Sequence, residues 1–269
     1  MEHRELGEGV RGLLRGLLRA TLDDPRAFYE AGYTQADAAE AERLGRWRAL
    51  GARSKAAHVR RLLEQTKLRP RRVVEIGCGD GALLAALQGF APVMDGFELS
   101  GPAAEIARRN APGARRVETF DGLEVPAEDG EYDLALLSHV IEHVPNYLPL
   151  VAEAARVANE VLIEVPLEDN RSARRPAKRE EAARIGHVHA FARGDLRDLL
   201  EEAGLVFEAD IADPLPLAHH AFFASSLRAR ASAAAKTAVR RGAWALAPRR
   251  AERWFTVHYA CLTVRRSLP

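Results

Sequence analysis

Residues 73–81 decide the fold, and they read Val73-Val74-Glu75-Ile76-Gly77-Cys78-Gly79-Asp80-Gly81. The β-branched and apolar residues at the start predict a short buried strand, and the pattern of residues 82–88 predicts a helix. Because Gly77, Gly79 and Gly81 carry no Cβ atom, a ligand can lie directly against the backbone of this turn. The segment therefore predicts a strand, a tight turn and a helix that together hold a cofactor.

Short apolar runs and helical patterns alternate after this segment. Neighbouring parallel strands need a crossover connection, which a helix usually supplies, so this rhythm predicts an α/β fold with a doubly wound, mostly parallel sheet. We expect further strands at residues 93–99, 116–120, 132–138, 160–165, 205–212 and 255–264, and helices at 103–110, 147–158 and 195–203.

Residues 1–70 have a different sequence pattern, without short apolar runs typical of strands. Apolar residues at helical spacing predict helices at 5–22, 34–49 and 54–66. We interpret residues 1–70 as an N-terminal helical extension that caps the cofactor and substrate site. Residues 71–269 form the second unit, in which an Ala- and Arg-rich helical insertion at about 215–253 precedes the last strand.

Two acidic residues indicate which cofactor is bound. Glu75 stands two residues before the first glycine, where it favours a ligand with a positive group and would repel a pyrophosphate. Glu98 ends the second predicted strand, where a carboxylate can accept hydrogen bonds from both ribose hydroxyls. A nucleoside joined to a cation describes S-adenosylmethionine. The glycine spacing also satisfies the dinucleotide fingerprint, so a nicotinamide-dependent oxidoreductase is the alternative.

The segments 73–81, 96–100, 120–122 and 132–138 resemble the ordered motifs of class I S-adenosylmethionine-dependent methyltransferases, of the type 11/12-like kind that act on small molecules. The resemblance covers about residues 71–212 and adds residues 255–264 as a final strand. It implies a Rossmann-like sheet of seven strands whose last strand is antiparallel. It also implies a set of cofactor-binding residues: Glu75, Gly77, Gly79 and Gly81 at the methionine part, Glu98 at the ribose, Asp121 with Gly122 at the adenine, and Ser138 at the end of the fourth strand.

The motif His139-Val140-Ile141-Glu142-His143 directly follows the fourth predicted strand, where a doubly wound sheet opens its ligand crevice. In a helical turn, His139, Glu142 and His143 would share one face. The motif resembles the Glu-x-x-Glu-His segment with which the ubiquinone-pathway O-methyltransferases and the small-RNA 2′-O-methyltransferases hold a divalent ion. His139 stands where those families have glutamate, which reduces the hard oxygen ligands that magnesium favours.

Three interpretations of this motif remain open. His139, Glu142, His143 and His187 could together hold magnesium or a similar divalent metal. Alternatively, His139 or His143 could act without metal as the general base that takes the proton of an alcohol. In the third interpretation, Glu142 and His143 only stabilise the fold.

The histidines at the crevice favour a hydroxyl acceptor on a small molecule, such as a sugar, a glycoconjugate or a phenol. Methylation of nitrogen or carbon is the alternative, and a further one is a non-catalytic module that binds the cofactor to stabilise a partner. The basic segment 227–247 fits a lid or homodimer surface, a contact with anionic lipid headgroups, or attraction of a phosphate- or lipid-linked acceptor. Nucleic acid is disfavoured, because only 6% of residues are aromatic and no RNA-binding motif is present.

The cysteines and the apolar stretches of the sequence predict where in the cell the protein is located. Cys78 and Cys261 are far apart and form no CxxC motif, which suits a reducing compartment. The first residues lack the pattern of a signal peptide, and no apolar stretch is long enough for a transmembrane segment. We therefore expect a cytoplasmic enzyme. The formal net charge of +1 does not by itself indicate a partner.

Overall fold

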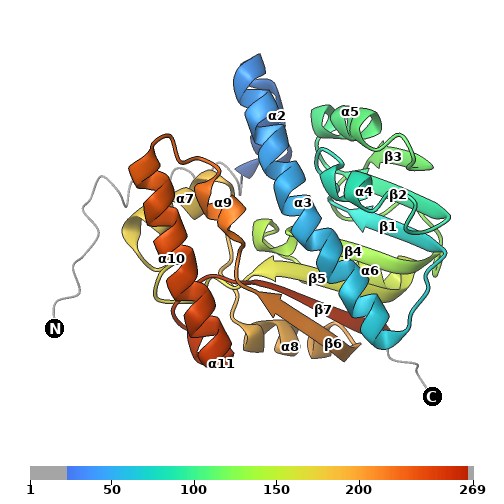
Figure 1. The fold of residues 1–269 in the computed structure, drawn as a ribbon. Coiled ribbons are helices and arrows are strands. Elements are labelled where there is room, and N and C mark those ends of the chain that lie inside the picture. The colour runs from blue at the N-terminus through green and yellow to red at the C-terminus, as the bar shows by residue number, and fades with distance from the viewer. Residues whose placement is uncertain (1–22, 266–269) are drawn as a thin grey trace.

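The computed structural model describes residues 23–265, which form a seven-stranded sheet in the order β3-β2-β1-β4-β5-β7-β6 (Figure 1). Strand β7 pairs antiparallel with both β5 and β6, and the other pairings are parallel. The predicted fold class is confirmed, including the antiparallel last strand. The strands are β1 (Arg72–Ile76), β2 (Val93–Glu98), β3 (Arg116–Thr119), β4 (Tyr132–Ser138), β5 (Ala158–Pro166), β6 (Leu205–Asp213) and β7 (His258–Arg265).

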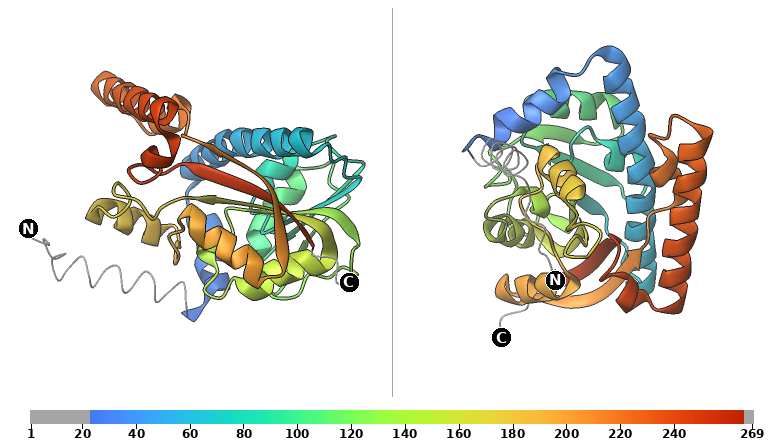
Figure 2. Two further views of the ribbon diagram at one scale, coloured as in Figure 1. Left: turned by 90° about the horizontal axis from the view of Figure 1, so that it is seen from below. Right: turned by 90° about the vertical axis from the view of Figure 1, so that its left-hand side faces the viewer.

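Helices cover both faces of the sheet. One face packs against α3 (Ala38–Thr66), α4 (Ala82–Ala86) and α5 (Gly101–Asn110), and the other against α6 (Leu148–Val157) and α8 (Arg193–Glu202). Figure 2 shows α3 and α8 on opposite sides of the strands. Parallel strands that are buried on both faces of a sheet need apolar side chains on both faces. This explains the continuous apolar run of residues 134–137 in β4.

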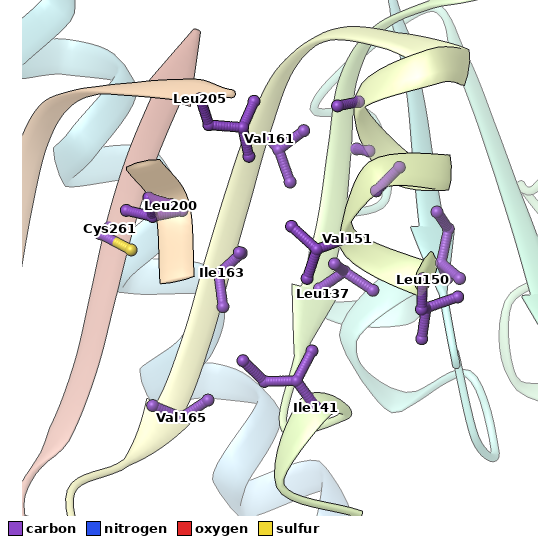
Figure 3. Close-up of a cluster of buried hydrophobic side chains, with 14 of the residues drawn as sticks. Leu137, Ile141, Leu150, Val151, Val161, Ile163, Val165, Leu200, Leu205 and Cys261 are labelled. Atoms are coloured by element: carbon purple, nitrogen blue, oxygen red, sulfur yellow. The ribbon is translucent and has the colours of Figure 1, made fainter. Parts of the chain in front are cut away.

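The core on the α6 and α8 face is drawn in Figure 3. Leu137 of β4 and Ile163 of β5 pack with Val151 of α6, and Leu200 of α8 lies near Cys261 of β7; all five are buried in one cluster. Each such side chain contributes about 1.5–3 kcal/mol when it is removed from water. This packing fixes β5 and its neighbour β4, and the carboxyl end of β4 carries the motif that begins at His139.

The remaining helices are α2 (Pro25–Thr34), the short 3-10 turn η1 (Ile141–His143), α7 (Pro176–Arg184), α9 (Leu217–Ala221), α10 (Leu227–Leu246) and α11 (Pro248–Ala251). Figure 1 shows α7, α9 and α10 together beyond one end of the central strands. Within residues 23–265, no helix combines the length and the apolar character that a bilayer crossing requires.

The N-terminal helices differ from the sequence prediction. The helices expected at 34–49 and 54–66 are one continuous helix, α3, which begins after Asp37, whose carboxylate accepts a hydrogen bond from the Glu40 N–H. Gly51 lies in its middle without breaking it, because the helix contains no proline and its second half is buried against the sheet. Helices α2 and α7 were not expected. The predicted helix at 5–22 lies outside the described residues.

A buried ionic network ties α3 to the sheet. His58 Nδ1 lies 3.0 Å from Glu164 Oε1 in β5, and its Nε2 lies 3.4 Å from Asp213 Oδ2 at the end of β6. Burial alone would lower the pKa of His58, but the hydrogen bonds to Asp213 and Glu164 raise it to about 9. Burial likewise opposes ionisation of Glu164, but the hydrogen bond to His58 and the nearby histidines lower its pKa to about 2. We conclude that His58 is a cation and Glu164 an anion at neutral pH.

The network predicts a stability difference that depends on pH. The His58 contribution is complete below its unfolded pKa of 6.5 and is lost as the pH rises through about 9, whereas the Glu164 contribution is lost only as the pH falls from 4.5 toward 2. His58→Gln leaves Glu164 without its buried counter-charge, so we expect a loss of about 3–5 kcal/mol in unfolding free energy at about pH 6. Urea unfolding of both proteins should show a smaller difference above pH 9.

The exposed variant Glu64→Gln on the same helix is the matched control and should change stability little. A His58→Gln deficit that is equally large at both pH values would contradict a charged His58.

Candidate functional site

The glycine turn after β1 packs directly against the end of β4. Gly77 has φ +77°, and a Cβ atom there would lie 2.7 Å from Val140 Cγ2. Gly81 has φ +75°, and its Cβ atom would lie 2.9 Å from the Cα atom of Ala107 in α5. A side chain fits at neither position, so the turn closes onto the residue that follows His139.

A cavity of about 1510 Å³ opens above this turn. It lies between the carboxyl ends of β1, β4 and β5 and the helices α3, α7, α9 and α10, which is where a doubly wound sheet binds its ligands. Of the residues predicted from sequence, seven line it: Glu75, Gly77, Gly79, Ser138, His139, His143 and His187. The other five lie behind or beside it: Gly81, Glu98, Asp121, Gly122 and Glu142.

Glu75 is a buried acid at the cavity wall. It is 3% exposed, and its Oε2 atom has no hydrogen-bond partner among the described residues. Burial raises its pKa to about 8, although the nearby Lys55 ammonium acts in the opposite direction. A buried carboxylate oxygen without a partner is costly unless a cation or a donor meets it. Glu75 therefore fits a ligand with a positive group, such as S-adenosylmethionine.

Glu98 is fixed at the end of β2 by the backbone around it. Its Oε2 accepts the N–H of Gly79 at 2.8 Å, and its Oε1 accepts the N–H of Ser100 at 2.9 Å. Burial raises its pKa, although these two N–H groups act against the shift. Each carboxylate oxygen retains a second lone pair, so the side chain is oriented and can still accept from ribose hydroxyls.

Asp121 and Gly122 lie at the edge of the sheet. Asp121 is exposed, and its Oδ1 accepts the N–H groups of Leu123 and Glu124, which lower its pKa. Gly122 has φ +87°. Asp121 thus stabilises its own turn, and its role at the adenine stays a prediction.

Helix α2, which lies within the predicted N-terminal extension but was not itself predicted as a helix, covers this edge. Arg26 donates to the carbonyl oxygens of Leu99 and Phe120 at 2.7 and 2.9 Å, next to the predicted ribose and adenine positions. Tyr33, from the same helix, lines the cavity beside Gly79. These contacts bring α2 over the ends of β2 and β3.

Glu142, His143 and His187 form one cluster of potential metal ligands, with one ligand atom of each within 4.8 Å of the others. Glu142 is fully buried, and neither of its oxygens accepts a hydrogen bond from the described part of the chain. The Nδ1 atom of His187 lies 2.7 Å from Glu168 Oε2, which leaves Nε2 for another contact. Burial lowers the pKa of His143 to about 4, so its ring is neutral, as a metal ligand requires. The cluster therefore fits a divalent ion.

His139 lies beside this cluster. Its backbone has φ +58°, a rare conformation for a residue with a side chain and a form of strain common at functional sites. Its Nδ1 lies 3.2 Å from Glu142 Oε1, while its buried Nε2 has no hydrogen-bond partner within residues 23–265. Burial lowers the pKa of His139 well below its usual range. The ring is therefore neutral, and its Nε2 atom is both buried and unpartnered among the described residues.

A second cluster brings His139 together with Glu164 and His258, again with ligand atoms within 4.8 Å. The rings of His139 and His258 are 4.5 Å apart. Glu164, however, already pairs with His58 and accepts a hydrogen bond from the Ser138 hydroxyl at 3.2 Å. We therefore assign Glu164 to the ionic network of the fold.

Several residues in and near the cavity carry no clear signal in the sequence. His258 opens the last strand and belongs to no recognisable motif. Glu168, which lines the cavity, and Glu164 give a weak signal, because Glu164 is the only charge between residues 161 and 167 and Glu168 follows that run. A charge in a strand buried on both faces requires a partner.

Comparisons with known proteins bear on the family and the fold. Residues 45–209 match a family model described as a methyltransferase domain. A ubiquinone biosynthesis O-methyltransferase of Thiobacillus denitrificans is 32% identical over 93 residues, a match that covers 32% of this chain and only 39% of that relative.

Two solved structures share the fold. A SAM-dependent methyltransferase from Thermotoga maritima aligns with a TM-score of 0.57 and 18% identity, over 94% of this chain and all of that one. Geranyl diphosphate C-methyltransferase from Streptomyces coelicolor A3(2), solved with Mg²⁺, geranyl diphosphate and S-adenosyl-L-homocysteine, aligns with a TM-score of 0.55 and 15% identity over 73% of this chain and 72% of that one.

The family model spans more than half of the 269 residues and includes the glycine turn, Glu98 and the motif at His139. This match favours S-adenosylmethionine over a nicotinamide dinucleotide. The chain belongs to the class I S-adenosylmethionine-dependent methyltransferases.

Proposed function

We propose that this protein transfers a methyl group from S-adenosylmethionine to a hydroxyl group of a small molecule, such as a sugar, a glycoconjugate or a phenol. The observation that carries the proposal is His139, a neutral imidazole at the cavity wall whose Nε2 atom has no partner among the described residues. A hydroxyl group must lose its proton to become an ether, and a neutral imidazole can accept that proton.

The cofactor would be held by residues at the β1 and β2 ends of the cavity. When bound, S-adenosylmethionine supplies an electrophilic methyl group on a sulfonium centre. Glu75 and the turn at Gly77 and Gly79 would hold its methionine part, and Glu98 the ribose hydroxyls. Lys55 lines the same wall and is close enough to Glu75 to influence its pKa, which supports a contact with the methionine carboxylate.

In the proposed reaction His139 is the general base. The tautomer required has its proton on Nδ1, the nitrogen that lies 3.2 Å from Glu142 Oε1, and its lone pair on Nε2. Nε2 would then accept the acceptor's hydroxyl proton as the oxygen bonds to the methyl carbon, the carbon–sulfur bond breaks, and S-adenosylhomocysteine leaves. Orientation of the acceptor by the cavity can provide about 7–11 kcal/mol of the barrier reduction, and proton transfer a further factor of about 10²–10⁴.

We further propose that Glu142, His143 and His187 hold a divalent metal ion. Support comes from the unpartnered carboxylate of Glu142 and from Glu168, which orients His187 as outer carboxylates orient metal-bound histidines. Two imidazoles and one carboxylate suit a transition ion such as manganese, iron or zinc better than magnesium. This assignment gives His139, which was predicted as a ligand, the separate role of base.

Cofactor binding can be tested with Glu98→Gln. A neutral amide cannot replace a carboxylate that accepts from both Gly79 and the ribose, so we expect the affinity for S-adenosylhomocysteine to fall about 10- to 100-fold in calorimetry. Glu105→Gln, an exposed change on α5, should leave it intact. Unchanged affinity in a folded Glu98→Gln protein would refute the ribose assignment.

The base can be tested with His139→Ala and a panel of phenols, sugars and amines, using S-adenosylmethionine with a tritiated methyl group. We expect turnover on the hydroxyl acceptor to fall about 10²- to 10⁴-fold, with S-adenosylhomocysteine affinity nearly unchanged. His189→Gln is the control, because His189 also lines the cavity but its Nε2 contacts the carbonyl oxygens of Val144 and Pro145. Full turnover in His139→Ala, or labelling of amines alone, would overturn the proposal.

The metal site can be tested without an acceptor. After chelation and dialysis against manganese or zinc, elemental analysis should find bound ion in the unaltered protein and little in Glu142→Gln. The ion should also raise the melting temperature of the first protein only, since it binds the folded state. Glu181→Gln removes a cavity-lining acid outside the cluster and should retain the ion. Equal metal content in all three proteins would count against the site.

A further inference from the structure

The outer part of the cavity lies between α7 and α10 and is lined by basic side chains. Lys178 and Arg179 extend from α7, and Lys236 and Arg240 from α10. Figure 1 shows both helices beyond the same end of the central strands, and residues of both line the cavity. This region belongs to the same cavity that His139 lines, so one elongated ligand can reach both.

Most of these cations are not neutralised by the protein. Lys178 pairs with Glu181 at 2.5 Å, and Arg174 at the same wall pairs with Asp169 at 2.6 Å. Within residues 23–265, no carboxylate lies within ion-pair distance of Arg179, Lys236 or Arg240. The mouth of the cavity therefore carries an excess of positive charge.

Arg240 is the most constrained of these residues. It is half-buried, and its Nη1 atom lies 2.9 Å from Nε2 and 3.1 Å from Nδ1 of His220. Burial and the Arg240 charge lower the pKa of His220 to about 4, so this histidine is neutral and can accept a hydrogen bond from the guanidinium but supplies no counter-charge. Burial and the charge of Arg175 also lower the pKa of Arg240. A guanidinium withdrawn from water without a counter-charge is stabilised when an anion binds.

On the cavity-lining face of α10, small side chains lie next to the basic ones. Ala229, Ser232, Ala233, Lys236 and Arg240 all line the cavity, and their spacing places them on one face of α10. The other basic residues of this helix, including Arg228 and Arg241, are exposed and do not line it. Small side chains and two cations thus face inward together, which suits a bound group better than a general surface charge.

We propose that the acceptor carries a phosphate or diphosphate group, which Arg179, Lys236 and Arg240 bind between α7 and α10. The inference rests on the proposed function, because it places the acceptor's hydroxyl end at His139 in the same cavity. A phosphate carries about −1.5 to −2 charges near neutral pH, which two or three cations can balance, and a guanidinium can bind two of its oxygens.

Inorganic pyrophosphate is the probe, titrated by calorimetry at low ionic strength into protein saturated with S-adenosylhomocysteine. We expect binding to the unaltered protein and about tenfold weaker binding after Lys236→Gln or Arg240→Gln, as expected for one charge-assisted contact. Lys236 is exposed, so its variant should fold normally. Arg228→Gln and Arg241→Gln are matched controls on the same helix and should bind pyrophosphate as the unaltered protein does.

The four variants of α10 distinguish failure of the phosphate site from failure of the proposed function. Pyrophosphate binding that is absent, or that all four variants weaken equally, would overturn the phosphate site. If S-adenosylhomocysteine still binds in that case, the proposed function stands and only its substrate class fails. Loss of cofactor binding in the unaltered protein would refute the proposed function itself.

A lipid headgroup could supply the same phosphate chemistry. Vesicles containing phosphatidylglycerol distinguish the sources, because a lipid-linked acceptor should bind vesicles in competition with pyrophosphate, whereas a soluble one should show pyrophosphate binding alone. Either result supports the site. A third result would overturn the phosphate site and indicate a membrane-facing helix instead. In that result pyrophosphate does not displace the vesicles, and Arg228→Gln and Arg241→Gln weaken vesicle binding as much as Lys236→Gln and Arg240→Gln do.

Discussion

The close approach of two backbone segments at Gly77 and Gly81 is the constraint on which the site depends. Gly81 allows α4 to begin against Ala107 of α5, and Gly77 allows the turn to contact Val140. Val140 lies between His139 and η1, so the same contact that shapes the cofactor turn also positions the histidine motif. The glycine turn and the histidine motif are thus adjacent because Gly77 carries no Cβ atom, and the Rossmann-like sheet supplies the rigid support.

Strong local patterns made most of the fold predictable from sequence. Strand β4 is a continuous apolar run buried on both faces, and its predicted limits, 132–138, are those observed. The prediction divided helix α3 in two because Gly51 weakens the local helix signal there. Burial of Ala52, Val59 and Leu62 against the sheet outweighs that weakness, and no sequence window contains this tertiary contribution.

The candidate site was only partly predictable, for a similar reason. Glu75, Glu98 and His139 each stand at the end of a predicted strand, so topology alone brings them to one edge. The ionic network joins His58 to Glu164 across 106 residues, and no spacing rule connects them. Lys55 likewise reaches the cavity only because α3 crosses the sheet. The motifs therefore indicated the cofactor better than the residues that surround the acceptor.

The two ends of the cavity differ in charge, which bears on how its ligands are oriented. At the glycine turn, Glu75 and Asp80 lie beside Lys55 and Arg48, and Arg48 pairs with Asp80 at 3.3 Å, whereas Lys236 and Arg240 at the α10 end have no carboxylate within ion-pair distance among residues 23–265. A donor that bears a sulfonium is therefore repelled from the α10 end, and an anionic group is attracted there. Each ligand would therefore find one orientation, with its reactive group near His139 between the two ends. Such a polarised cavity aligns two reactants before reaction, which is the largest contribution that a protein can make to a displacement needing little other chemistry.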